Sequence, residues 1–300
     1  IIACFQGYVL EFQGFAMELE QLVFFTKQYG VLVHQAAIQS DAVFGSLSDD
    51  VPDLEDYLGP DIARGISRVL HKPVQILGRF KQTLPNNWKL YVENVRDTYH
   101  ASLLHVFFTT FRLNRLSQKG GVVVSECGGN HISFSAIDPI AENSEDYKTE
   151  ELRSEKDDFK LEDATLLKGI DEFGDGVTLQ ILSVFPGFVL AQIQNTIAVR
   201  QVLPEGLETT ALNWVYLGFQ DDTPELRELR LLQANLVGPA GYISMEDTEA
   251  TELVQRGTAR DGDKHSYIAM AREAPDQQDT VITENLIRRF WVGYQKLMSY

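Results

Sequence analysis

The sequence predicts an α+β domain in which a curved antiparallel sheet carries helices packed on one side of it. Three observations lead to this prediction. Four strand candidates follow one another between residues 177 and 219, with turn residues between them. Helical patterns occupy much of the chain after residue 223. An earlier stretch, residues 60–104, reads as helix, strand and helix in turn.

The N-terminal part of the chain gives the weakest signals. Residues 1–42 are apolar and aromatic but show no sustained period. The next segment, "FGSLSDDVPDLEDYLGP", has the turn residues of a surface connection. "PDIARGISRVL" predicts a short helix with Pro60 near its start. Residues 74–85 alternate well enough for a strand.

A longer helix is expected over residues 88–104, because apolar residues recur there at intervals of three and four. "GGVVVSE" and "HISFSAID" then predict two strands around Gly128 and Gly129. The strongly charged residues 141–175 are interpreted as a solvated excursion from the core.

The last part of the chain supplies the meander and its helices. "VTLQILSVFP", "FVLAQIQN", "TIAVRQVLP" and "TTALNWVYLGF" predict four antiparallel strands in succession. Thr223 and Pro224 begin a helix that closes at Gly238. Two more helices are expected, one including residues 244–257 and one over 284–298.

Composition excludes several classes of protein. With 44% hydrophobic residues the chain can bury a sizeable core. A net charge of −17 repels phosphate backbones, so no nucleic-acid partner is expected. The longest apolar run is short and broken by Pro186 and Gly187, and no secretory signal is evident, so no membrane association is expected. Two cysteines, Cys4 and Cys127, make no disulfide framework, which favours a cytoplasmic location.

The stretch "NWKLYVENVRDTYHASLLH" places His100 five residues before His105. Two histidines and one carboxylate suit Fe(II) that activates dioxygen. On a regular helix such a pair lies about 140° apart, so either the helix ends near Leu103 or a π-bulge rotates His105. Asp97 is expected beside His100 on the helix surface, where its carboxylate would accept the far N–H of the imidazole. On spacing alone, packed or partly exposed histidines remain the favoured interpretation.

The pattern E-N-x-x-D-x-Y-H-x-x-x-x-H in this stretch resembles the Rieske non-haem iron aromatic ring-hydroxylating oxygenases, in the catalytic domain of their large (alpha) subunit. "FFTTFRLNRLSQKGGVVVSE", "DGVTLQILSVFPGFVLAQIQN" and "ISMED" extend the resemblance over residues 43–300. Within the family, the chain looks most similar to terephthalate dioxygenase large subunits, with salicylate 5-hydroxylases close behind. The resemblance implies a helix-grip fold and a mononuclear Fe(II) on His100 and His105.

The resemblance also implies the other residues of the site. The third iron ligand would be Asp247 in "GPAGYISMEDTEATELVQRG", with Glu246 as the neighbouring alternative. An acidic residue near a helix start also suits the helix dipole without any metal. Asp97 would lie on the electron path from a Rieske-cluster histidine of a neighbouring subunit. Asn94 would contact the iron ligands.

Substrates of this group are aromatic carboxylates, which an acidic protein would hold with arginine. Arg200, in an otherwise apolar strand, is the first candidate, and a buried ion pair is the alternative. Arg288 is a weaker candidate because Arg289 beside it could be the inward residue; a surface charge at a helix end is the alternative for both. Five apolar residues could line the pocket, although core packing is favoured for each: Phe107, Phe108, Val184, Phe185 and Ile193.

One part of the family pattern is missing. The C-x-H…C-x-x-H motif that binds the 2Fe–2S Rieske cluster has no counterpart here, so the Rieske domain is expected to be absent. Residues 1–42 would then be a remnant or linker after a missing Rieske domain, and residues 43–300 the catalytic domain. The chain begins with Ile, as a fragment can. It would bind iron and substrate yet not turn over alone, because the electrons come from NADH through a reductase and the cluster.

Two functions from different classes are consistent with these residues. The first is O₂-dependent hydroxylation of a terephthalate-like aromatic carboxylate, giving a cis-dihydrodiol or a phenol, in a homotrimer or α₃β₃ assembly. The alternative is a non-catalytic helix-grip module that binds aromatic carboxylates, which the missing cluster motif favours and the complete His/His/Asp set opposes. A 2-oxoglutarate-dependent oxygenase is set aside, because its ligands have the order H-x-D…H.

Overall fold

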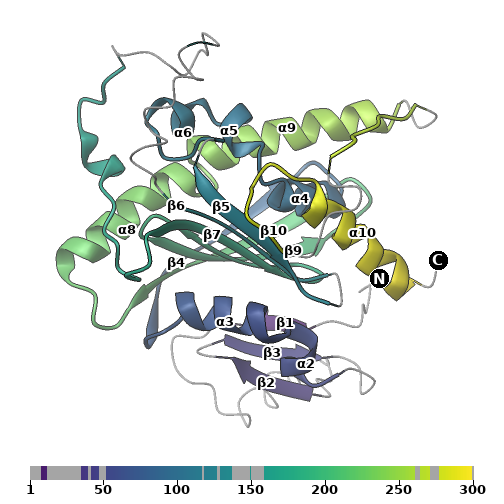
Figure 1. Ribbon diagram of the computed structural model, residues 1–300, viewed down its shortest axis with the longest axis horizontal. Helices are drawn as coiled ribbons and strands as arrows, with labels where there is room; N and C mark the ends of the chain where they lie inside the picture. Colours follow the sequence, from purple (N-terminus) through teal and green to yellow (C-terminus); the bar gives the residue numbers. More distant parts are fainter. Residues whose placement is uncertain are drawn as a thin grey trace.

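An eight-stranded antiparallel sheet forms the centre of the molecule (Figure 1). The structure is a computed structural model, and it describes residues 8–11, 35–39, 42–46, 52–116, 118–126, 129–136, 149, 159–260, 264–270 and 277–298. The strand order in the sheet is β11-β5-β6-β7-β8-β9-β10-β4. The strands are β4 (Val74–Leu84), β5 (Lys119–Val124), β6 (His131–Ala136), β7 (Val177–Val184), β8 (Phe188–Ile193), β9 (Thr196–Pro204), β10 (Thr210–Phe219) and β11 (Gln277–Gln278).

The predicted meander is confirmed. Strands β5 to β10 pair with their sequence neighbours, and only two residues separate β8 from β9. β4 departs from this order, because it pairs with β10 rather than with β5. The strand that enters the sheet first therefore lies beside the strand that ends the meander.

Helices cover both faces of the sheet, so the prediction that they pack on one side was incomplete. One face carries α2 (Leu54–Leu58), α3 (Pro60–Val69) and a small sheet of β1 (Tyr8–Glu11), β3 (Ala42–Ser46) and β2 (Gln35–Gln39) (Figure 1). The opposite face carries α4 (Trp88–Arg96), α5 (Ala101–Leu104), α6 (Val106–Thr110), α8 (Pro224–Val237), α9 (Tyr242–Thr258) and α10 (Asn285–Met298).

Two hydrophobic cores follow from this arrangement. Ile62 and Ile66 of α3 pack into one core with Leu182 and Leu190 of the sheet. This also corrects the interpretation of residues 44–60 as a surface connection, because the segment contains α2, whose Leu58 is fully buried in the same core. The second core lies under α4 and α10 on the opposite face and contains Trp88, Val92, Val189, Trp214 and Phe290.

The remaining predicted elements agree closely with the structure. The helix from Pro60, the strand from residue 74, the strand pair β5–β6 and the three C-terminal helices are all present. Thr223 caps α8 by accepting the N–H of Leu226 at 3.2 Å. Cys4, Cys127 and, within the charged segment 141–175, residues 141–148 and 150–158 lie outside the described residues. None of the described helices is both long and apolar enough to span a membrane.

Candidate metal centre

The helix expected over residues 88–104 is interrupted at Asp97. The Asp97 carboxylate accepts the backbone N–H groups of Tyr99 at 3.3 Å and His100 at 3.0 Å. A short polar side chain that binds nearby backbone competes with helical hydrogen bonds, and α4 therefore ends at Arg96. A single turn, α5, follows and ends at Leu104, because His105 has φ −83° and ψ 81°. The first alternative for the histidine spacing is thus confirmed, and the described segment 88–110 contains no π-bulge.

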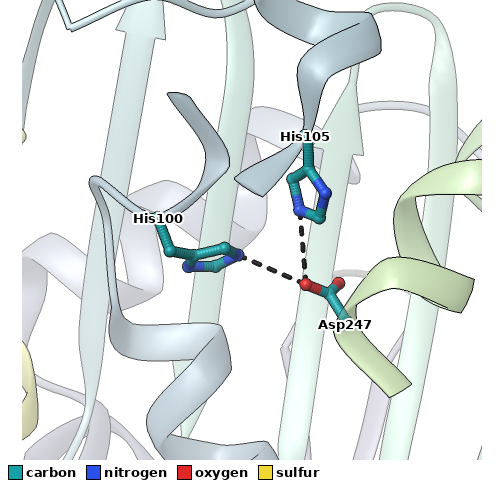
Figure 2. Close-up of side chains that lie close together, drawn as sticks. All are labelled: His100, His105 and Asp247. Carbon is teal, nitrogen blue, oxygen red and sulfur yellow. Dashed lines mark ion pairs between the residues drawn. The ribbon is translucent and has the colours of Figure 1, made fainter. Parts of the chain in front are cut away.

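This break brings the two histidines together. Their ring centroids lie 5.2 Å apart, and both rings point toward Asp247 in the first half of α9 (Figure 2). Asp247 Oδ1 lies 3.4 Å from His100 Nε2 and 3.3 Å from His105 Nε2. The potential ligand atoms of the three residues all lie within 4.8 Å of one another. The structure therefore gathers the three predicted ligands at one point.

The far nitrogen of each ring has an acceptor that fixes the position of its proton. His100 Nδ1 lies 2.6 Å from the backbone carbonyl of Asp97, and His105 Nδ1 lies 2.8 Å from Glu246 Oε2. Because a carbonyl and an ionised carboxylate only accept, each Nδ1 carries hydrogen, and each Nε2 is then the atom that can give its lone pair to a metal ion beside Asp247. Two lone pairs and a carboxylate oxygen at this separation need a cation between them, either a proton or a metal ion.

The electrostatics of the site agree with this requirement. Burial opposes the charged form of His100, but the nearby carboxylates of Asp247 and Asp97 outweigh burial and raise the pKa of His100 to about 10. Burial also opposes ionisation of Asp247, yet its hydrogen bonds to His100 and His105 hold its pKa well below its usual range. The cluster stabilises positive charge beside an ionised carboxylate, as a site for a divalent cation must.

The predicted contact of the Asp97 carboxylate was wrong in detail. Its Oδ1 lies 3.8 Å from His100 Nδ1, and the backbone carbonyl of the same residue is the closer partner. The reason is that the helix ends at this residue, so the carboxylate turns to the N–H groups that follow. Asn94, predicted to contact the ligands, donates to Asp247 Oδ1 at 3.1 Å and lies 3.5 Å from His100 Nε2.

Glu246 was considered only as an alternative iron ligand, and its hydrogen bond to His105 was not predicted. Adjacent residues on a helix point about 100° apart, so Glu246 and Asp247 cannot aim at the same point. Asp247 faces both Nε2 atoms, while Glu246 reaches the back of the His105 ring. Once Asp247 is taken as the ligand, helix geometry alone therefore directs Glu246 to a different point.

The loop that carries His100 is braced from the C-terminal part of the chain. Thr98 Oγ1 donates to the carbonyl of Val281, and the Tyr99 hydroxyl donates to Glu284. Both partners lie in the segment between β11 and α10, and no pattern in the sequence links that segment to residues 97–100.

A cavity of about 90 Å³ lies beside the three residues. Arg200 lines it, with only 9% of its surface exposed. One guanidinium nitrogen donates to the Tyr91 hydroxyl at 3.0 Å, and the group lies 5.0 Å from the centre of the Trp214 ring. Its Nε is buried and has no hydrogen-bond partner. In the part of the chain that the structure describes, no carboxylate forms an ion pair with Arg200, which goes against the alternative of a buried ion pair.

The other predicted pocket residues divide into two groups. Phe108 and Ile193 line the cavity. The remaining three belong to packing: Phe107 contacts Phe111 and Tyr242, Val184 lies in the core beneath α3, and Phe185 lies in the core beneath α10.

Arg288 also lies away from the cavity, so the structure does not bring it into the site. Its guanidinium donates to the backbone carbonyls of Met270 at 3.1 Å and Ile268 at 2.5 Å. These bonds tie α10 to the loop before it.

The family model for the ring hydroxylating alpha subunit (catalytic domain) matches residues 62–299. The chain belongs to this family. Its members use a mononuclear iron and a Rieske cluster. In the described ranges, His100, His105 and Asp247 form the one group of three or more histidine, cysteine or acidic residues arranged to hold a metal ion.

Curated relatives agree with the resemblance in the sequence. The alpha 2 subunit of the terminal oxygenase component of terephthalate 1,2-dioxygenase from Comamonas sp is 55% identical over 276 residues, which cover 92% of this chain and 67% of the relative. The anthranilate 1,2-dioxygenase large subunit from Burkholderia cepacia is 50% identical, covering 91% and 65%. The large oxygenase component of salicylate 5-hydroxylase from Ralstonia sp is 33% identical, covering 91% and 64%. The chain thus spans about two thirds of the length of these relatives.

The solved structures support the fold. Naphthalene 1,2-dioxygenase from Rhodococcus sp., with indole bound, superposes with a TM-score of 0.70 at 17% identity, covering 88% of this chain and 66% of that one. The expected catalytic-domain fold, with its antiparallel sheet and helices, is therefore confirmed.

Proposed function

We propose that this chain is an oxygenase catalytic domain that hydroxylates an aromatic carboxylate at a mononuclear Fe(II) held by His100, His105 and Asp247. The observation that carries the proposal is the convergence of two Nε2 atoms on one carboxylate oxygen at 3.3–3.4 Å. The hydrogen-bond acceptors at both Nδ1 atoms leave these Nε2 lone pairs available.

The donor set fits the metal. Two neutral imidazoles and one carboxylate match the facial arrangement that holds non-haem Fe(II) and leaves coordination positions open. When bound, iron supplies an electron and a place for dioxygen to be activated. The protein does the positioning: Asn94 holds Oδ1 of Asp247, and Glu246 holds the ring of His105.

Arg200 is the proposed partner of the substrate carboxylate. It faces the same cavity as Asp247, its Nε has no partner, and burial strengthens any charge-assisted bond that it makes. Burial works against its charge, but Tyr91 and Asp247 hold the pKa of the guanidinium above its ordinary value. Terephthalate, anthranilate and salicylate, which the names of the three relatives contain, are all aromatic carboxylates.

The rest of the reaction system follows from the family. We propose that electrons come from NADH through a reductase and a Rieske cluster supplied from outside this chain, and that Asp97 lies where they enter. A homotrimer or an α₃β₃ assembly, a cytoplasmic location and a catalytic domain over residues 43–300 complete the proposal. Without a source of electrons, the chain would bind iron and substrate but not turn over.

Anaerobic loading with Fe(II), followed by nitric oxide and EPR spectroscopy, tests the proposal. About one high-spin iron–nitrosyl centre per chain is expected, perturbed by added terephthalate and lost in Asp247→Ala. Glu249→Ala is the matched control, because Glu249 is exposed on the same helix. A folded chain that takes up no stoichiometric iron would overturn the oxygenase assignment and leave the alternative, a module that binds aromatic carboxylates.

A further inference from the structure

A second, smaller void adjoins the cavity beside the candidate ligands. It measures about 10 Å³, against about 90 Å³ for the main cavity. A void of that size holds about one water molecule. The two spaces share four apolar wall residues: Phe108, Leu179, Ile193 and Val237.

Leu179 and Ile193 form one ridge of this shared wall. They are direct partners in the β7–β8 pairing, so their side chains project from the same face of the sheet. Two residues further along the same face, Ile181 pairs with Ala191. Ile181 lines the main cavity but not the small void, so it lies next to the ridge on the side of the main cavity.

The registers also place Arg200 relative to this ridge. On the strand β9, Thr196 pairs with Ile193, Ala198 pairs with Ala191, and Arg200 pairs with Val189. Arg200 therefore lies four residues from the ridge along the sheet, or about 13 Å between the two rows of Cα atoms. Between them is a row with two small residues, Ala191 and Ala198, both almost fully buried.

The far wall of the small void is held in place. Gln233 Nε2 donates to the carbonyl of Lys168 at 2.8 Å and to Gln194 Oε1 at 2.7 Å, and Gln233 Oε1 accepts the N–H of Asn195 at 3.0 Å. Since these amides bind one another and the backbone, that wall does not yield easily. The ridge is then the boundary whose size sets the length of the space.

We propose that the Leu179–Ile193 ridge limits the substrate to a single aromatic ring. This rests on the proposed function, in which Arg200 holds the carboxylate. The ring lies against Ile181, between the guanidinium of Arg200 and the ridge, and its far edge stops at the ridge. The main cavity, at about 90 Å³, is smaller than an engineered apolar cavity of about 150 Å³ in another protein that holds one benzene molecule, so it leaves no room for a second ring. Truncating the ridge joins the small void to the cavity and lengthens the site.

The test compares two aromatic acids on the full 300-residue chain, loaded with Fe(II) under anaerobic conditions. Benzoate has one ring and 2-naphthoate has two, and calorimetry measures the affinity of each without turnover. The unaltered chain is expected to bind benzoate and to bind 2-naphthoate weakly. Leu179→Ala is expected to improve 2-naphthoate binding by about tenfold or more, as expected when a site gains room for several carbon atoms.

Leu182→Ala is the matched control. It removes the same side chain from the same strand but from the opposite face, where Leu182 packs in the core beneath α3 and lines neither space, so the affinity for 2-naphthoate should stay close to that of the unaltered chain. Ile193→Ala removes the other half of the ridge and repeats the test if Leu179→Ala does not fold, with circular dichroism and thermal melting as the check on folding.

The outcomes separate this inference from the proposed function. A chain that binds benzoate and 2-naphthoate equally well, or an equal gain in Leu179→Ala and Leu182→Ala, overturns the ridge as the limit while aromatic-acid binding stands. A folded, iron-loaded chain that binds neither acid overturns the proposed function and the ridge proposal together.

Discussion

Arg230 and Arg200 are both buried beside the sheet, and their surroundings differ. Arg230 of α8 has 1% of its surface exposed and binds Asp222 and Glu172 through four charge-assisted hydrogen bonds of 2.8–3.1 Å. It also donates to the carbonyl of Asn195. Arg200, with 9% exposed, has one phenol and one aromatic ring around it and a free Nε beside a cavity.

This difference indicates that Arg230 has a structural role, whereas Arg200 is available to bind a ligand. A buried ion loses its hydration, and the loss is recovered only through good partners. In the Arg230 cluster, defined as Arg230, Asp222 and Glu172, all partners lie within the described chain. Arg200 has fewer partners than Arg230, so part of its lost hydration is not replaced within the described chain. A negatively charged ligand in the cavity would replace it. Unsatisfied donors at a buried cation thus indicate a binding site better than burial itself does.

The largest expected effect is on stability. Arg230→Met leaves the buried carboxylates of Asp222 and Glu172 without their positively charged partner, so the free energy of unfolding should fall by about 3–5 kcal/mol in urea titrations. The same substitution at Arg200 removes one neutral partner and no ion pair, and its cost should stay below about 1.5 kcal/mol. Equal losses for the two variants would contradict the distinction between the two arginines.

The second prediction concerns binding. Arg200→Met should lower the affinity for benzoate by about 10–100-fold, because each hydrogen bond to a charged group contributes about 1.5–3 kcal/mol. Iron content, read from the iron–nitrosyl EPR signal, should not change. Arg200→Lys keeps the positive charge but lacks the planar guanidinium group, so its affinity for benzoate should lie between those of the unaltered chain and Arg200→Met. Unchanged benzoate affinity in Arg200→Met would show that the carboxylate binds elsewhere.

The third prediction concerns the contact between Glu246 and His105. Glu246→Ala should weaken Fe(II) binding by about 10–100-fold, as loss of a hydrogen-bond partner of a ligating histidine usually does. Glu246→Gln keeps an acceptor for Nδ1–H and should recover part of the loss. Competition with a chelator measures the affinity, and a changed iron–nitrosyl line shape would report a turned ring. A loss of stability alone would not give weaker iron binding in Glu246→Ala together with partial recovery in Glu246→Gln. Equal iron affinities in the two variants would contradict a role for the hydrogen bond between Glu246 and His105.

The smallest effect on stability is expected for an arginine–aspartate pair that, unlike the Arg230 cluster, is exposed to solvent. Arg68 binds Asp175 in a bidentate pair at 2.6 and 2.9 Å, and that hydrogen bonding lowers the pKa of Asp175. A lowered folded-state pKa gives stability that is present above the unfolded value, about 3.9, and is lost as the pH falls through the folded value. Solvent screening keeps this below about 1 kcal/mol. Asp175→Asn should slightly flatten the acid side of the stability–pH curve, and a loss as large as that of Arg230→Met would contradict the role of burial.

Much of the fold was predictable because its signals are local. Alternating or continuous apolar runs between turn residues marked β7 to β10, and Thr223 with Pro224 marked the start of α8. The second helical layer was missed because "LQILSVF" has few polar residues, and only contacts show that both faces of β7 are covered. The break at Asp97 was missed because apolar spacing continues across it.

The site was predictable only through the family pattern. Asp247 lies more than a hundred residues after His105, and spacing cannot show that α9 returns to the histidines. The Arg230 cluster also depends on separate segments, since Glu172 and Arg230 lie 58 residues apart and meet only in the folded chain. A charged residue in an apolar strand, such as Arg200, was visible as an anomaly, but whether it had a partner required the structure.

The pairing of β4 with β10 has a consequence for synthesis of the chain on the ribosome. After Leu84 emerges, residues 85–209 must follow before Thr210 arrives to pair with it. At translation rates of about 5–20 residues per second, β4 waits roughly 6–25 s for its partner. During that time an apolar strand is available to other chains, and Arg79 and Lys81 within it are the kind of charged residues that discourage such pairing. Chains interrupted before Thr210 should therefore be prone to aggregation and dependent on chaperones.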